Sequence, residues 1–131
     1  MNFKKTTLSN GLRVITVPTK GNPSVMVLMV VETGSNYETK SQNGLSLFLE
    51  HMCFKGTTKR PKASLIAKEL DALGAQNNAF TSNELTGYYA KAAKKHFFKL
   101  FEIISDLYLN HKLPSEDLEK ERGVILEEIS M

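Results

Sequence analysis

The first part of the chain alternates turn residues with short apolar runs of strand length. A turn dipeptide at Asn10-Gly11 precedes the β-branched segment 12–17, which predicts a strand that ends at Pro18. The continuous apolar run over 25–31 predicts a second strand. Uninterrupted runs of this kind are typical of a central strand that is covered on both faces.

Helical periodicity follows. The segment 42–56 is apolar nearly all round, which predicts a buried helix. A second, amphipathic helix is expected from Pro61 to Gly74, because proline favours the first helical turn and glycine the residue after a helix. A third amphipathic helix is expected over 96–111, and six residues form its predicted buried stripe: Phe97, Leu100, Phe101, Ile104, Leu107 and Tyr108.

Two further strands are predicted between the second and third helices. They occupy 76–81 and 85–90 and are joined by the turn 82–84. Connections of hairpin length favour antiparallel neighbours. We therefore expect an α+β fold in which helices pack on one face of a largely antiparallel sheet, as a single domain over 1–131.

The last predicted helix begins at Ser115, which we interpret as its N-cap, and Glu116 and Asp117 complement the positive end of its dipole. The helical pattern then continues to Met131 without a stop signal. We therefore expect that the domain is truncated at its C-terminal end.

Composition limits the classes of function. A hydrophobic content of 41% and a charged content of 24% indicate an ordinary globular protein. The net charge of +3 is scattered and only 8% of residues are aromatic, so we expect no nucleic-acid partner. A single cysteine, Cys53, excludes an internal disulfide. We expect no membrane segment and see no signal peptide, which favours the cytoplasm or an organelle matrix.

Charged residues in apolar helices carry the candidate chemistry. Glu50 and His51 lie in the middle of the most apolar segment, where an unpaired charge is costly, so each needs a partner. A structural salt bridge is the usual explanation. Glu121 and Glu128 are two helical turns apart on one face of the last helix, and Gly123 between them suggests close packing against another helix. The alternative is an acidic, solvated surface helix.

Several motifs together resemble one peptidase family. They are Gly44-Leu45-Ser46, the run Phe48-Leu49-Glu50-His51-Met52 with Phe54-Lys55-Gly56-Thr57, Asn78-Ala79-Phe80-Thr81, and Glu121-Arg122 with Val124-Ile125-Leu126 and Glu128. In register along the whole chain, they are similar to the N-terminal domain of the pitrilysin family of inverted-motif (H-x-x-E-H) zinc metalloendopeptidases, which includes mitochondrial processing peptidase and insulin-degrading enzyme.

The resemblance implies a role for each matching residue. His51 and Glu128 would be zinc ligands, Glu50 the general base, and Glu121 a carboxylate that orients the site. The segment Asn78, Ala79 and Phe80 would bind substrate as an exposed strand edge. The implied partners are an extended peptide and either further domains or a second subunit of the same family.

Leu47 departs from the family pattern, because it occupies the position of the first zinc histidine. A catalytic zinc has three protein ligands, and only two remain, so we expect weak or absent zinc binding and an inactive or severely impaired domain. His96, His111 and Cys53 do not look like substitutes. Two alternatives stay open: an active zinc endopeptidase with a recruited ligand, and a non-catalytic subunit that only binds peptides.

Overall fold

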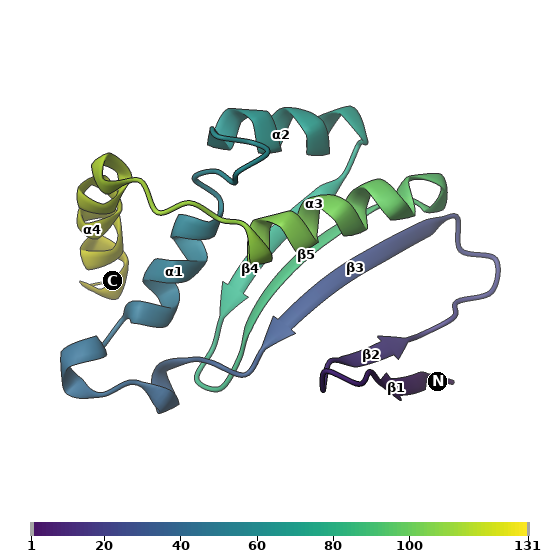
Figure 1. Ribbon diagram of the computed structural model, residues 1–131, viewed down its shortest axis with the longest axis horizontal. Helices are drawn as coiled ribbons and strands as arrows, with labels where there is room; N and C mark the ends of the chain where they lie inside the picture. The colour runs from purple at the N-terminus through teal and green to yellow at the C-terminus, as the bar shows by residue number, and fades with distance from the viewer. Residues whose placement is uncertain (1, 131) are drawn as a thin grey trace.

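The structure is a computed structural model that describes residues 2–130, with the side chain of residue 129 left out. Figure 1 shows a sheet with helices on one side and a small hairpin near the N-terminus. The strands are β1 (Lys4–Thr7), β2 (Arg13–Thr16), β3 (Ser24–Val31), β4 (Gln76–Thr81) and β5 (Thr86–Ala93). The helices are α1 (Leu45–Cys53), α2 (Ala63–Ala72), α3 (Phe97–Leu109) and α4 (Ser115–Ser130), with short 3₁₀ turns η1 (Ser35–Tyr37), η2 (Lys40–Gln42) and η3 (Lys94–His96).

The main sheet is antiparallel, with the strand order β3-β5-β4. This confirms the predicted α+β class with a largely antiparallel sheet. The strands β1 and β2 form a separate two-stranded hairpin. Its first strand was not predicted, because Lys4–Thr7 contains no apolar residue.

The prediction that the strand over 25–31 is central and covered on both faces is wrong. The central strand is β5, and β3 lies at an edge of the sheet. Alternate side chains of a strand point to opposite faces. Val27 is buried beneath the helices, whereas Met26, Leu28 and Val30 on the other face are 45–50% exposed. The continuous apolar run therefore reflects an open apolar face and not burial on both sides.

Helix α3 packs on the sheet over β3 and β5. Four of its side chains are fully buried, and burial of each contributes roughly 1.5–3 kcal/mol: Leu100, Ile103, Ile104 and Leu107. The predicted stripe was wrong at Phe97 and Phe101, which are largely exposed, and it omitted Ile103. The true stripe points straight at the sheet, and the two phenylalanines lie on the flank of the helix.

One helix boundary and one helix surface differ from expectation. The carbonyl of Pro114 accepts the first bond of α4, from the N–H of Leu118 at 3.2 Å, so Ser115 is the first helical residue and not the N-cap. Helix α1 is not buried all round, because Leu45 and Leu49 are exposed. Its buried side faces β4 and α4.

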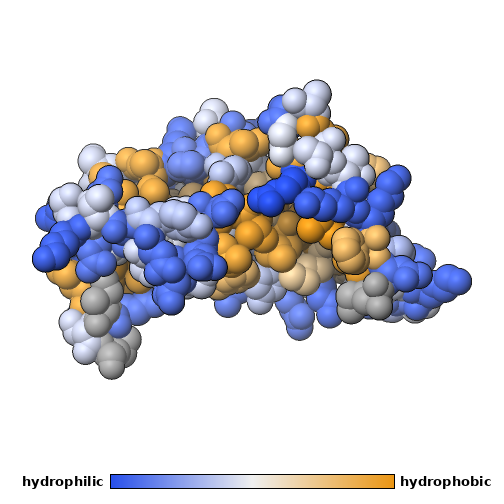
Figure 2. All heavy atoms as spheres, turned by 90° about the horizontal axis from the view of Figure 1, so that it is seen from below, coloured by the Kyte–Doolittle hydropathy of each residue, from blue (hydrophilic) through white to orange (hydrophobic). Residues whose placement is uncertain are grey.

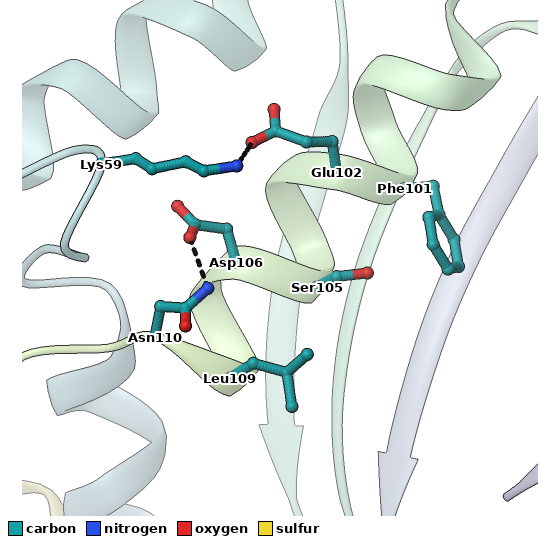
Figure 3. Close-up of a pocket in the computed structure, with 7 residues that line it drawn as sticks. All are labelled: Lys59, Phe101, Glu102, Ser105, Asp106, Leu109 and Asn110. Atoms are coloured by element: carbon teal, nitrogen blue, oxygen red, sulfur yellow. Dashed lines mark hydrogen bonds and ion pairs between the residues drawn. The ribbon is translucent and has the colours of Figure 1, made fainter.

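A buried arginine joins the loop after α1 to α2 and α3. The guanidinium of Arg60 donates to Glu69 (2.9 and 3.0 Å), Glu102 (2.6 and 3.2 Å) and Asp106 (2.6 Å). The Thr57 hydroxyl donates to Asp106 at 2.6 Å. Figure 3 shows the α3 side of this group, where Asn110 and Lys59 approach the same carboxylates beside an open hollow of about 270 Å³.

These contacts lower the pKa values of the carboxyls around Arg60. Hydrogen bonds from Arg60, then from Lys59 and Lys99, lower the pKa of Glu102 to about 2. Burial by itself would raise the pKa of Asp106, but bonds from Thr57, Asn110 and Arg60 hold it below its ordinary value. All three carboxylates therefore stay charged at neutral pH and pin the helices together.

Candidate metal centre

Helices α1 and α4 pack side by side and bring together residues that are seventy positions apart. Nδ1 of His51 lies 3.1 Å from a carboxylate oxygen of Glu121, and Nε2 lies 3.5 Å from a carboxylate oxygen of Glu128. Among the residues of α4 whose side chains the structure describes, Glu121 and Ile125 are buried, so this face of the helix is held against α1. The predicted approach of these two helices is therefore present in the structure.

Glu121 has two side-chain partners, His51 and Lys55. It accepts a hydrogen bond from Nδ1 of His51 and forms an ion pair with Lys55. Burial of the Glu121 carboxyl favours a raised pKa, but the bonds and charges of Lys55 and His51 outweigh it and lower the pKa. The contribution of Lys55 was missed in the sequence, because a lysine after an apolar helix is usually a solvated side chain.

The contact with Glu121 orients the ring of His51. When Nδ1 carries the proton that is donated to Glu121, Nε2 keeps its lone pair and faces Glu128. A histidine that ligates a metal typically donates its other ring N–H to a carboxylate in this way. The geometry thus gives His51 the tautomer that a metal ligand requires.

Glu50 is not part of the His51 cluster in this structure. One of its carboxylate oxygens accepts a hydrogen bond from the hydroxyl of Thr81, on strand β4, at 2.7 Å. This contact ties α1 to the end of the edge strand and was not predicted. Glu50 therefore lies where helix and strand meet.

Leu47 lies one helical turn before His51. It lines an open hollow of about 320 Å³, whose wall also includes Glu128, Thr81 and Asn83. Its hydrocarbon side chain offers no donor atom to an ion. On the same hollow, Glu38 accepts bonds from the N–H groups of the first turn of α1, and the bond from Ser46 is the main cause of its lowered pKa.

The donor atoms can be tested against the geometry of zinc. Two ligands of a tetrahedral zinc, at about 2.0–2.2 Å from the ion, are about 3.4 Å apart. The 3.5 Å between His51 and Glu128 fits two such positions. A third is missing: within residues 2–130 no group of three His, Cys, Asp or Glu side chains is arranged to hold a metal. The residues present therefore do not fit a catalytic zinc.

The other candidate ligands have different partners. Nδ1 of His111 contacts the carbonyl of Tyr108 at 2.9 Å. Cys53 is buried beside the hydroxyl of Tyr88, and burial raises the pKa of its thiol. His96 lies at the other end of the domain, at the start of α3. In the part of the chain that the structure describes, the hydrogen-bond partners of His111 and Cys53 are Tyr108 and Tyr88 and not the residues of the His51 cluster.

The residues Asn78, Ala79 and Phe80 lie on β4, the second edge of the main sheet. Their partners on β5 are Tyr89, Tyr88 and Gly87. Asn78 and Phe80 are exposed on the open face of the sheet, and the side chain of Asn78 accepts the N–H of Ala79 at 2.9 Å. This edge ends at Thr81, beside Glu50, so it runs up to the candidate centre.

The proposed reason for Gly123 is wrong. A β-carbon at Gly123 would have no atom within 4 Å among the described residues, so close packing does not require glycine there. The face of α4 that packs on α1 is carried by Glu121 and Ile125 instead.

Comparison with known proteins agrees with these features. Residues 13–131 match the family model Insulinase (Peptidase family M16). Over 95% of its length the chain is 46% identical to the mitochondrial-processing peptidase subunit beta of Dictyostelium discoideum, and over 98% it is 40% identical to the uncharacterized zinc protease YmxG of Bacillus subtilis. A crystal structure of a protease from Helicobacter pylori superposes on 97% of the chain with a TM-score of 0.90 and 30% identity, and this chain covers 30% of it.

The fold and the motif around Glu50 and His51 define the class of this protein, an α+β domain of metallopeptidase type. The chain belongs to the insulinase family, peptidase family M16. It spans 26% and 31% of the two curated relatives named above. In the part of the chain that the structure describes, no helix combines the length and hydropathy that a membrane crossing requires.

Proposed function

We propose that this domain binds extended peptides along the outer edge of β4 and does not hydrolyse them by itself. One observation carries the proposal: the position one turn before His51 is Leu47, which lines the hollow in front of Glu128. Zinc in such a centre activates water and polarises a carbonyl. Because the donor set lacks a third ligand, we assign no such step to this chain.

The remaining polar residues keep the roles that the motif implies, as proposals. His51 and Glu128 are the two residual ligand positions, and Glu121 orients His51 through Nδ1. Glu50 is the base in the motif, and here its bond to Thr81 ties α1 to the peptide-binding edge. We expect weak or absent zinc binding, because a site with two protein ligands gains less binding free energy than one with three. The entropy cost of ordering its side chains is nearly the same.

The edge of β4 supports peptide binding. Its outer side has no strand partner among the described residues, so main-chain groups remain available for an added strand. Phe80 supplies an exposed ring on the open face, and Asn78 supplies an exposed amide. Since the Asn78 side chain now accepts the N–H of Ala79, an incoming carbonyl would replace that bond.

The wider setting of the domain is also a proposal. The name of one relative describes it as a subunit of a mitochondrial-processing peptidase. By analogy we propose that this domain acts with further domains or a second subunit of the same family, in the cytoplasm or an organelle matrix. The peptide would then be held between them.

A binding assay with and without metal tests the proposal. A fluorescently labelled, unstructured peptide is titrated with the chain after dialysis against EDTA, and again with added zinc. We expect the same affinity in both conditions, no cleavage by mass spectrometry, and less than one zinc per chain by elemental analysis.

A variant and two opposing outcomes complete the test. Phe80→Ala should weaken peptide binding, whereas Leu65→Ala, a change of an exposed apolar side chain on α2, should not. Tight equimolar zinc with zinc-dependent cleavage would support the alternative of an active endopeptidase with a recruited ligand. Absence of peptide binding in every condition would refute the binding role.

A further inference from the structure

The hollow in front of Leu47 lies at the end of the β4 edge. Thr81 is the last residue of β4, and it lines the hollow together with Ser82 and Asn83. The Thr81 hydroxyl donates to Glu50 of α1, so this side chain points to the helical side of the sheet. Directly opposite residues of neighbouring strands point to the same face. A peptide added along β4 would therefore turn the side chain opposite Thr81 toward the helices, beside the hollow.

One carboxylate on the wall of the hollow lacks a close partner. The acidic lining residues are Glu38 and Glu128, and none of the described lining residues is lysine, arginine or histidine. Glu38 accepts the N–H groups of Gly44 and Ser46, each at 2.7 Å, so its charge is compensated at the start of α1. Among the described residues, Glu128 has only the contact of 3.5 Å with Nε2 of His51. The hollow is therefore a site of uncompensated negative charge.

The other polar groups of the wall are bonded to the protein. The hydroxyl of Ser35 donates to Oδ1 of Asn83 at 3.1 Å, and the hydroxyl of Ser82 donates to the carbonyl of Leu85 at 2.9 Å. The side chain of Leu47 supplies a hydrocarbon surface next to them. A hydrocarbon surface near one carboxylate suits a ligand with an aliphatic stem and a positive charge at its end.

The position of Glu128 favours an ammonium group over a guanidinium group. Its Oε2 is the oxygen that lies 3.5 Å from the ring of His51. A guanidinium group binds best when two oxygens face its planar fork. An ammonium group is a compact charge, for which one oxygen is sufficient. The expected ligand is therefore a lysine side chain and not an arginine side chain.

The surface at this end of the molecule is polar. Figure 2, seen from below, shows mostly hydrophilic residues at the left, where Figure 1 places α4 and the short turns between β3 and α1. An apolar band crosses the middle, where the main sheet runs. Apolar side chains of a bound peptide would therefore find partners along the sheet, and a charged side chain would find its partner at the end of β4.

We propose that the hollow is a specificity pocket for one lysine side chain of the bound peptide. The aliphatic stem packs on Leu47, and the ammonium group pairs with Glu128. This inference rests on the proposed binding of peptides along β4. It gives Leu47 a role of its own: the residue that offers no ligand to a metal supplies the apolar contact for the stem.

Three peptides that differ at one residue test the pocket. Each is an alternating valine and threonine sequence with blocked, uncharged ends, and its central residue is lysine, arginine or norleucine, which keeps the lysine stem without the charge. Fluorescence anisotropy in EDTA gives each affinity. We expect lysine to bind about threefold to tenfold more tightly than norleucine, with arginine in between. The chain carries a net charge of +3, so a general attraction would not favour the lysine peptide.

Two matched pairs of variants locate the effect. Glu128→Gln should reduce the ratio of lysine to norleucine affinity to about one, whereas Glu127→Gln, the same change at the exposed neighbour, should leave the ratio unchanged. Leu47→Ala should weaken the lysine and norleucine peptides alike, by about threefold, because both use the stem contact. Leu45→Ala, at an exposed position of the same helix, should weaken neither. Thermal denaturation checks that each variant is folded.

The outcomes separate this inference from the proposed function. Equal affinities for the lysine and norleucine peptides would overturn the pocket and leave peptide binding at β4 intact. Tighter binding of arginine than of lysine, or a lysine preference that persists in Glu128→Gln, would also overturn it. Absence of binding by all three peptides would refute the proposed function and the pocket together.

Discussion

Arg60 and His51 are both cations or potential cations that are surrounded by carboxylates of distant helices, but their surroundings differ in completeness. The side chain of Arg60 is 6% exposed, and all three of its nitrogens donate to Glu69, Glu102 or Asp106. The ring of His51 is 24% exposed, and its second nitrogen lies 3.5 Å from a Glu128 carboxylate that is 47% exposed.

The difference separates a structural cluster from a binding cluster. Every donor of Arg60 has an acceptor, and removal of Arg60 leaves the buried carboxylate of Asp106 without a cation. Around His51, the lone pair of Nε2 and the carboxylate oxygens of Glu128 have only a long contact of 3.5 Å with each other. They can therefore still accept a hydrogen bond or ligate an ion. Fully satisfied networks rigidify a fold, and partly satisfied ones are available to ligands.

The largest expected effect is on Arg60. Arg60→Met leaves the nearly fully buried Asp106 without its cation, and we expect a loss of about 3–5 kcal/mol in the free energy of unfolding. Urea denaturation measures this loss. The control is Arg13→Met, whose exposed ion pair should matter by less than about 1 kcal/mol. A loss for Arg60→Met as small as that of the control would remove the distinction between the two clusters.

The second prediction completes the His51 cluster. Leu47→His places an imidazole one turn before His51 and supplies the third ligand. Zinc at one hundred times its dissociation constant should then stabilise the fold by about 2.7 kcal/mol, seen as a zinc-dependent rise in melting temperature. Leu45→His, on a different side of the same helix, is the control. Peptidase activity of the isolated variant should stay near background.

The third prediction concerns acid, which should lower the free energy of unfolding by protonating the carboxylates around Arg60. The pKa of Glu102 is lowered from 4.5 to about 2 by Arg60 and its neighbours, and the pKa values of Glu69 and Asp106 are lowered as well. Because the folded pKa lies below the unfolded one, this stability is complete above about pH 4.5 and is lost as pH falls toward 2. We expect a loss of roughly 2 kcal/mol after solvent screening. In Arg60→Met the acid-dependent loss should be smaller than in the unchanged chain, and the loss that remains should come from carboxyls with other partners, such as Glu121 and Glu38, whose pKa values are also lowered.

The smallest expected effect is on Glu128. Glu128→Gln should change the free energy of unfolding by less than about 0.5 kcal/mol, because the carboxylate is half exposed and its contact with His51 is long. Thermal denaturation provides the measurement. A loss above 2 kcal/mol would show that this cluster is as complete as that of Arg60.

The same contrast explains which parts of the molecule could be predicted from the sequence. The elements after residue 24 follow from apolar periodicity and from turn residues, and the antiparallel order follows from the short connections. The His51 centre follows from a local motif that fixes Glu50 and His51 on one helix. The approach of Glu121 required only that two apolar helix faces meet.

The Arg60 cluster has no such local pattern. Its members Arg60, Glu69, Glu102 and Asp106 look like ordinary surface charges, and only the tertiary packing of α2 on α3 makes them a group. The edge position of β3 was missed for a related reason. An apolar run indicates that its side chains favour burial, but it does not indicate which neighbouring element covers them.

Phe80 lies over Gly87, its partner on β5, so closely that a β-carbon at residue 87 would be 2.4 Å from the ring. The ring takes the place that a side chain on the central strand would fill. Any larger residue at 87 would therefore push Phe80 away from the edge at which we propose that peptides bind. Positions 80 and 87 are therefore coupled in space: a side chain at 87 fits only where the side chain at 80 is smaller or is displaced from the strand edge.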